Sequence, residues 1–170
     1  YMTGYGVSAS LLGKPDAGLV SYREMVDRVR AICEVTTVPL IADGDTGFGG
    51  LANLRQAVQG YENAGASAIQ IEDQEYPKRC GHTRNRKVIS TKDMVRKIEL
   101  ACETRQSDAL LIVARTDALT EHGLDEALSR AEAYRGAGAD VLFVESPESL
   151  CQMRMINEHL AGTPTLANMV

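Results

Sequence analysis

Residues 38–50, VPLIADGDTGFGG, pass directly from an apolar run to two acidic residues and a series of glycines. The apolar part is too short for an ordinary helix and fits a strand that is covered on both faces. The two aspartates stand where that strand ends. Buried parallel strands that end in polar groups are typical of α/β folds, whose ligand sites lie at the carboxyl ends of the strands.

Similar apolar runs recur along the chain about every 25 to 40 residues, which is the length of a strand-plus-helix unit. They cover 68–71, 110–114, 141–144 and 165–167, and 1–3 adds a sixth predicted strand. The segments between them carry helix signals. Two begin at a capping serine, Ser21 or Ser90, and two end at Ala-Gly-Ala, residues 64–66 and 137–139.

Polar side chains stand at the end of nearly every predicted strand. This pattern helps to distinguish an open, doubly wound sheet from a closed barrel. Regular alternation of strands and helices fits either a doubly wound sheet or a (β/α)8 barrel. A doubly wound sheet usually concentrates its chemistry at one switch point, whereas a barrel brings the ends of all strands onto one axis. The polar strand-end residues are Asp43, Asp45, Glu72, Asp73, Arg115, Asp117, Glu145 and Asn168. We therefore expect an α/β fold of the (β/α)8 TIM barrel type, a single domain over 1–170 with about six of eight strands, truncated at both ends.

The composition is that of a globular domain that binds neither nucleic acid nor membranes. The net charge is −5, with 44% hydrophobic and 24% charged residues. A basic surface for nucleic acid is therefore not expected, and no apolar run approaches the roughly 20 residues that span a bilayer. The four cysteines are widely spaced, which favours a reducing compartment over a disulfide framework. We expect a cytoplasmic protein.

The paired aspartates Asp43 and Asp45 are candidate ligands of a divalent cation. Carboxylates two residues apart on an extended segment point the same way, and Mg²⁺ binds one or two carboxylates together with waters and substrate oxygens. The alternative is a strand-to-helix turn whose aspartates cap the next helix. One of Glu72 and Asp73 should also face the axis and join the metal shell, unless they form a surface salt bridge.

Arg115 follows an apolar strand and is expected at the mouth of the core. A guanidinium in such a place needs an anion, and its planar fork suits a carboxylate. The anion is either internal, with Asp117 and Glu145 as candidates, or the carboxylate of a substrate.

Residues 78–82, KRCGH, place a thiol between two cations and a histidine. Cys80 there suits an acid or a nucleophile, on a long loop of the kind that closes over barrel sites. The alternatives are a chance surface thiol or a soft metal ligand, although one Cys-Gly-His lacks the ligand count of a structural zinc site.

The chain resembles the isocitrate lyase/phosphoenolpyruvate mutase superfamily over essentially its full length. The motifs that carry the resemblance are DGDTGFG (43–49), IEDQ (71–74), KRCGH (78–82), ARTDA (114–118), FVESP (143–147) and LANM (166–169). The Cys-Gly-His loop is similar to that of the lyase branch. The opening segment, 3–16, is similar to the short-chain 2-methylisocitrate lyases and 2,3-dimethylmalate lyases, and Gly4-Tyr5-Gly6 tilts toward the dimethylmalate type.

The resemblance implies a Mg²⁺-dependent carbon–carbon lyase that forms homotetramers, with Mn²⁺ as a possible substitute. Retro-aldol cleavage of a small 2-hydroxy di- or tricarboxylate would give a 2-oxoacid such as pyruvate and a second carboxylate. It assigns the metal to Asp43, Asp45 and Glu72, and catalysis to Cys80 as general acid, His82 and Tyr1. It assigns substrate binding to Thr3, Gly4, Tyr5, Asp16, Gly81, Arg115, Glu145 and Asn168.

Two other functions stay open from the sequence. One is a different reaction within the superfamily, namely hydrolysis or decarboxylation of oxaloacetate, or the phosphonate chemistry of the phosphoenolpyruvate mutases. The other is a truncated, inactive domain that binds only a metal or a partner.

Overall fold

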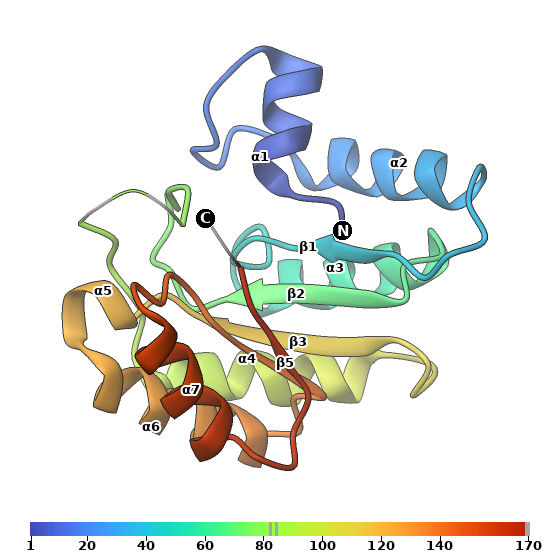
Figure 1. The fold of residues 1–170 in the computed structure, drawn as a ribbon. Helices are drawn as coiled ribbons and strands as arrows, with labels where there is room; N and C mark the ends of the chain where they lie inside the picture. The colour runs from blue at the N-terminus through green and yellow to red at the C-terminus, as the bar shows by residue number, and fades with distance from the viewer. Residues whose placement is uncertain (82, 84, 169–170) are drawn as a thin grey trace.

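The computed structural model describes residues 1–81, 83 and 85–168, in which strands and helices alternate along the chain (Figure 1). The helices are α1 (Gly4–Val7), α2 (Tyr22–Cys33), α3 (Leu51–Asn63), α4 (Thr91–Thr104), α5 (Leu119–His122), α6 (Leu124–Gly136) and α7 (Leu150–His159), with a π-helical turn at Ser8–Leu12. The strands are β1 (Ile41–Asp43), β2 (Ala68–Glu72), β3 (Leu111–Thr116), β4 (Val141–Val144) and β5 (Thr165–Leu166). Among the helices of the described residues, none is both long and apolar enough to cross a bilayer.

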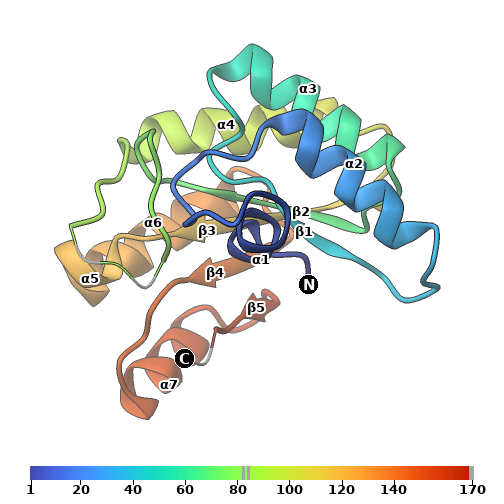
Figure 2. The ribbon, with the colours of Figure 1, turned by 90° about the horizontal axis from the view of Figure 1, so that it is seen from above.

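The strands form one parallel sheet in the order β1-β2-β3-β4-β5. Because each strand lies beside its sequence neighbour, the order never reverses, and the described sheet has no switch point of the doubly wound kind. Viewed from above, α2, α3, α4, α6 and α7 form an arc around the outside of the curled sheet (Figure 2). The arrangement is an incomplete (β/α) barrel, as the sequence predicted.

The predicted first strand, 1–3, is reduced to a single parallel bridge between Met2 and Ala42. The bridge still places the start of the chain beside β1, where a sixth strand would lie. The predicted strand at 38–42 begins later than expected, at Ile41. Val38, which precedes it, is 68% exposed.

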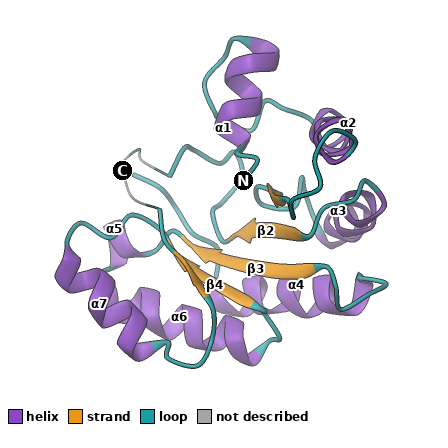
Figure 3. Cartoon of the chain, turned by 45° about the vertical axis from the view of Figure 1, so that its right-hand side comes forward, coloured by secondary structure: helices purple, strands orange, loops and turns teal. Residues whose placement is uncertain are grey.

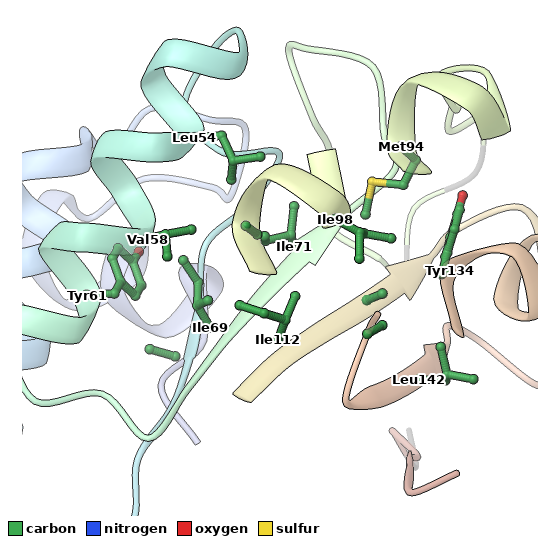
Figure 4. Packing of buried hydrophobic residues seen from close by; sticks show 14 of the residues in the cluster. Leu54, Val58, Tyr61, Ile69, Ile71, Met94, Ile98, Ile112, Tyr134 and Leu142 are labelled. Atoms are coloured by element: carbon green, nitrogen blue, oxygen red, sulfur yellow. The ribbon is translucent and has the colours of Figure 1, made fainter. Parts of the chain in front are cut away.

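The helices pack on the outer face of the sheet and form the main core. Figure 4 shows side chains of α3, α4 and α6 meeting those of β2, β3 and β4. The labelled residues are Leu54, Val58, Tyr61, Ile69, Ile71, Met94, Ile98, Ile112, Tyr134 and Leu142, all fully buried. Removing one of the larger aliphatic side chains here would cost about 2–5 kcal/mol. This core holds the strands rigidly, so that their ends can carry a site.

The inner face of the sheet is different because alternate residues of each strand point to opposite sides. Gln70 and Glu72 alternate with the core residues Ile69 and Ile71, and Glu72 lies in register with Arg115 on β3. The strands end on the same side of the molecule (Figure 3). The inner, polar set of side chains is therefore gathered at the carboxyl end of the sheet.

The helix signals read from the sequence are present in the structure. Ser21 and Glu24 form the reciprocal hydrogen bonds of a capping box at the start of α2, and Ser90 caps α4. Gly65 and Gly138, which follow α3 and α6, have φ of 95° and 101°. Residues with a side chain rarely adopt this conformation, so glycine ends each helix and lets the chain turn into the next strand.

Candidate active site

A cavity of about 560 Å³ opens at the carboxyl ends of the strands, a size that suits a small organic ligand. It is lined by Tyr1, Thr3, Tyr5, Asp16, Asp43, Cys80, Gly81, Arg115, Phe143, Glu145, Leu166, Ala167 and Asn168. Most of these residues were singled out from the sequence. Asp45 lines a neighbouring cavity of about 520 Å³ together with Lys78. His82 lies outside the described residues.

Asp43 is held rigidly at the end of β1. Its Oδ2 accepts a hydrogen bond from the backbone N–H of Gly4 at 3.1 Å, and its Oδ1 accepts from the N–H of Asp45 at 3.1 Å and from Gln70 Nε2 at 3.2 Å. The next helix, α3, begins after Gly50 and does not use these aspartates as caps. The helix-cap alternative is therefore wrong.

The structure also resolves the choice between Glu72 and Asp73. Glu72 lies on the inner face, 3.6 Å from Arg115 Nη1. Asp73 turns toward the helices, where it accepts hydrogen bonds from Thr116 Oγ1 at 2.8 Å and Tyr134 Oη at 2.7 Å. Glu72 is thus the acid available to the site, and Asp73 is structural. Both are buried, so neither forms the surface salt bridge that was the alternative.

Lys78 supplies a positive charge among these acids. Its Nζ lies 2.7 Å from Asp45 Oδ1 and 2.8 Å from Asp16 Oδ1, and the side chain is only 3% exposed. Burial alone would lower the pKa of the ammonium, but the surrounding carboxylates raise it well above its usual value. Lys78 is therefore charged at any physiological pH.

Arg115 has internal anions as partners. Its guanidinium forms two hydrogen bonds to Asp117, at 2.8 and 2.9 Å, and Nη1 lies 3.2 Å from Glu145 Oε2. The same group lies over the ring of Phe143, 5.4 Å from its centroid. Arg115 is fixed in place before any substrate arrives, and a cavity-lining guanidinium can still face a substrate carboxylate.

Acidic groups outnumber basic groups at this end of the sheet. The described acids are Asp16, Asp43, Asp45, Glu72, Asp73, Asp117 and Glu145, and the described bases are Lys78, Arg86, Lys97, Arg115 and Arg130. Burial and then the charge of Asp43 raise the pKa of Asp45 to about 7, and burial raises the pKa of Glu72 well above its usual value. Such a buried excess of negative charge favours binding of a cation.

The oxygen donors present fit Mg²⁺. Glu72 Oε1 is buried with no hydrogen-bond donor among the described residues, whereas Asp45 Oδ1 and Glu145 Oε2 lie 2.7 and 3.2 Å from the cations of Lys78 and Arg115. Within residues 1–81, 83 and 85–168, no three His, Cys, Asp or Glu side chains are already gathered as a complete metal site. Mg²⁺ does not require such a cage, because it commonly takes one or two carboxylates and completes its shell with water and substrate oxygens.

Tyr1 points its hydroxyl into the site, although the residue as a whole is 53% exposed. The hydroxyl donates a short hydrogen bond to Gln70 Oε1. Burial of the hydroxyl and the charge of Asp43 raise its pKa above the usual value. At neutral pH the phenol is protonated, so in this state it can donate a proton but not accept one.

Cys80 lies half-buried on the wall of the cavity, next to Gly81. The loop that carries them follows β2 and returns at Val88, which pairs with Gln74. Gly81 is packed tightly against the guanidinium of Arg115 on β3 and the side chain of Glu145, which follows β4. A Cβ added there would lie 2.4 Å from Arg115 Nη2 and 3.0 Å from Glu145 Cδ.

We expect Gly81→Ala to move the thiol away from the strand ends and to reduce turnover by on the order of 100-fold, because a shift of about 1 Å can cost that much. The overpacking should cost about 1–3 kcal/mol of stability. Gly136→Ala is the matched control, since a Cβ at that helical position meets nothing within 4 Å. Steady-state kinetics of the intact protein and thermal unfolding measure the effect, and a Gly81→Ala variant as active and as stable as the parent would contradict the tight packing.

Lys78 and Gln70 are contributors whose positions the sequence did not predict. Gln70 could have been found, because it shares the inner face with Glu72 by the two-residue period of a strand. The sequence indicated Lys78 only as one of the cations next to Cys80, and not as a partner of the carboxylates. Its contact with Asp16 joins residues 62 positions apart, and no local pattern predicts such a contact.

A curled parallel sheet in sequential strand order, with acidic side chains gathered around a cavity at the strand ends, is typical of the (β/α)-barrel class of proteins. The chain belongs to the phosphoenolpyruvate phosphomutase family of the phosphoenolpyruvate mutase/isocitrate lyase superfamily, whose family model matches residues 1–169. This confirms the resemblance seen in the sequence motifs.

The matches to two curated relatives extend over nearly the whole of this chain. It is 54% identical over 170 residues to a 2,3-dimethylmalate lyase of Eubacterium barkeri, covering 100% of this chain and 58% of that protein. It is 43% identical over 169 residues to a 2-methylisocitrate lyase of Salmonella typhimurium, covering 99% and 57%. The chain therefore spans a little over half the length of the relatives it matches.

Solved structures give the same family. A crystal structure of 2,3-dimethylmalate lyase matches with a TM-score of 0.97 at 39% identity, covering 100% of this chain and 57% of that one. Oxaloacetate acetylhydrolase in complex with 3,3-difluorooxalacetate matches with a TM-score of 0.93 at 37% identity, covering 97% and 57%. Phosphonopyruvate hydrolase in complex with oxalate and Mg²⁺ matches with a TM-score of 0.85 at 33% identity, covering 95% and 56%.

Proposed function

We propose that the intact protein is a Mg²⁺-dependent carbon–carbon lyase. Its substrate would be a small 2-hydroxy di- or tricarboxylate of the 2,3-dimethylmalate or 2-methylisocitrate type. Cleavage would give a 2-oxoacid such as pyruvate and a second carboxylate. The observation that carries the proposal is that one cavity combines the carboxylate of Asp43, the thiol of Cys80 and the guanidinium of Arg115. The similarity to two lyases of these names supports the choice of reaction.

In this proposal Asp43 and Asp45 hold the metal, with Glu72 in its outer shell. Bound Mg²⁺, or Mn²⁺ in its place, supplies positive charge that stabilises negative charge on the oxygens of the substrate. The backbone N–H of Gly4 and the amide of Gln70 keep the Asp43 carboxylate oriented. The donor set is consistent with the Mg²⁺ present in the phosphonopyruvate hydrolase structure.

Cys80 acts as the general acid. When the 2-hydroxyl group gives its proton to a base, for which the ionised form of Tyr1 is the candidate, the C2–C3 bond breaks and a C2 carbonyl forms. The bonding electrons pass to C3 and its carboxylate, and the Cys80 thiol donates a proton to C3. We assign tuning of the thiol to His82 and retain Tyr1 as a candidate catalytic group. Tyr1 would have to lose its proton before it could act as a base, because its pKa is raised in the free protein.

The remaining residues of the cavity bind the substrate. We assign this role to Thr3, Gly4, Tyr5, Asp16, Gly81, Arg115, Glu145 and Asn168. Thr3 caps α1 by accepting from the N–H of Gly6 at 2.8 Å, so the start of this short helix is fixed beside the cavity. The apolar side chains of Phe143 and Leu166 give one wall that suits the methyl groups of a branched substrate. We further propose that the protein is cytoplasmic and assembles as a homotetramer.

A second candidate function is hydrolysis of oxaloacetate to oxalate and acetate, which the similarity to oxaloacetate acetylhydrolase favours. That reaction also breaks a carbon–carbon bond of a small dicarboxylate. It differs from lyase chemistry in consuming water.

A substrate panel with the intact protein separates the two functions. We expect pyruvate or a similar 2-oxoacid to form from 2,3-dimethylmalate or 2-methylisocitrate, with activity lost in EDTA and restored by Mg²⁺ or Mn²⁺. Product identification by NMR is the measurement. Oxalate and acetate formed from oxaloacetate, with no cleavage of the other two substrates, would favour the hydrolase.

A further inference from the structure

The peptide that carries Cys80 is held on one side by the side chain of Gln74. The backbone N–H of Arg79 donates to Gln74 Oε1 at 2.9 Å, and Gln74 Nε2 donates to the carbonyl oxygen of Arg79 at 2.9 Å. This carboxamide binds one residue through both of its backbone groups, as a neighbouring strand would. Gln74 is 2% exposed, so the pair is protected from competing water.

On the other side of Cys80, Ser146 binds the backbone of Gly81. Its hydroxyl donates to the carbonyl oxygen of Gly81 at 2.9 Å. Ser146 follows β4 and adopts a φ of 62°, a left-handed conformation that is uncommon for a residue with a side chain. Such strain persists where the surroundings fix the residue, and it is concentrated at functional sites.

Arg86 determines which way the Ser146 hydroxyl points. It is 3% exposed, and its Nη1 donates to Ser146 Oγ at 3.3 Å and to Asp117 Oδ1 at 3.1 Å. A hydroxyl has one proton to donate, and Gly81 O is nearer than Glu145 Oε1, which lies 3.3 Å away. With Arg86 donating to the oxygen, the hydroxyl proton is directed to the Gly81 carbonyl.

We propose that Gln74 and Ser146 are positioning residues that fix Cys80 over the cavity by binding the backbone of its two neighbours, Arg79 and Gly81, with Arg86 orienting Ser146. The inference rests on the proposed role of Cys80 as general acid. Proton transfer to carbon needs the donor within hydrogen-bonding reach and correctly aligned. The side-chain clasp is formed by Gln74 at the base of the loop, Arg86 on its returning arm and Ser146 after β4, and it provides this alignment.

The test uses Ser146→Gly and Gln74→Glu in the intact protein. Glycine removes the hydroxyl and also relieves the left-handed strain, so Ser146→Gly should fold at least as well as the parent protein. Glutamate keeps an acceptor for the Arg79 N–H but loses the donor to its carbonyl oxygen. Ser21→Ala is the matched control, because it removes a capping hydroxyl whose hydrogen bonds are made to Glu24 of α2.

Two readouts are measured, namely steady-state kinetics and the rate at which iodoacetamide alkylates each cysteine, resolved by peptide mass spectrometry. For both variants we expect kcat to fall about 10- to 100-fold with KM changed less than about threefold. Alkylation of Cys80 should accelerate roughly fivefold or more as the loop opens, while Cys33 and Cys102 keep their parent rates.

Unchanged Cys80 alkylation in Ser146→Gly, or effects no larger than those of Ser21→Ala, would overturn the proposal. The alkylation readout needs no lyase activity. A protein that shows the change in alkylation but cleaves no substrate would therefore contradict the proposed function and leave the positioning role supported.

Discussion

Cys80→Ser should reduce turnover by about 100- to 10,000-fold, which is the usual contribution of a positioned general acid. A serine hydroxyl fits the space of the thiol but is a far weaker acid, so the carbon released from C2 would have to take its proton from solvent. Affinity for Mg²⁺ and for the 2-oxoacid product should stay within a few-fold of the parent, because the aspartates and Arg115 are untouched. The measurements are kcat and calorimetric titrations with metal and pyruvate.

Cys151→Ser is the control for the thiol substitution. Cys151 is exposed on α7 and does not line the cavity, so the same chemical change there should leave kcat unaltered. Full turnover by Cys80→Ser would remove the thiol from the mechanism. The proton that reaches C3 would then have to come from another group or from water.

Asp43→Asn is expected to have the second large effect, and this effect should require the metal. With Mg²⁺ present, loss of one ligand charge should weaken metal binding and lower turnover by 100-fold or more, on the order of the effect of losing a metal-ordering group. Without metal, the same change relieves repulsion between Asp43 and Asp45, which raises the pKa of Asp45. This relief is opposed by the loss of an acceptor, because both Asp43 oxygens receive N–H groups and one of them becomes an NH2 donor, so the metal-free stability should change little.

Thermal unfolding in EDTA and in saturating Mg²⁺ measures both effects. The parent protein should gain stability on adding Mg²⁺, and Asp43→Asn should gain little. Asp27→Asn is the control, because Asp27 is an acid on the exposed face of α2 that pairs only with Arg23 and Arg30 among the described residues. Equal Mg²⁺ stabilisation of parent and variant would show that Asp43 is not a ligand.

Much of the site follows from the two-residue period of the strands. The alternation places Glu72 and Arg115 on one face and directs Asp73 to the other, but the sequence could not say which acid of the pair faces inward. That choice depends on Tyr134 and Thr116, which bind Asp73 from another helix and strand. The direction of a single side chain at a strand end is decided by such partners and not by local pattern.

The fold was predictable because each strand carries its own signal, whereas the loop contacts were not. Short apolar runs and glycine helix ends fixed the order of elements, and sequential strand order then excludes a switch point. The contact of Lys78 with Asp16 and that of Ser146 with Gly81 join distant loops. These contacts form only when the sheet curls and brings the loops together. They therefore could not be predicted from composition or residue spacing.

The most direct measurement is a crystal structure of the intact protein with Mn²⁺ and oxalate, with the metal located by its anomalous scattering. The account predicts a single peak within coordination distance of Asp43 or Asp45, with Cys80 facing the bound oxalate across the cavity. A peak elsewhere, or a Cys80 thiol directed away from the ligand while its loop is packed against Arg115, would contradict it.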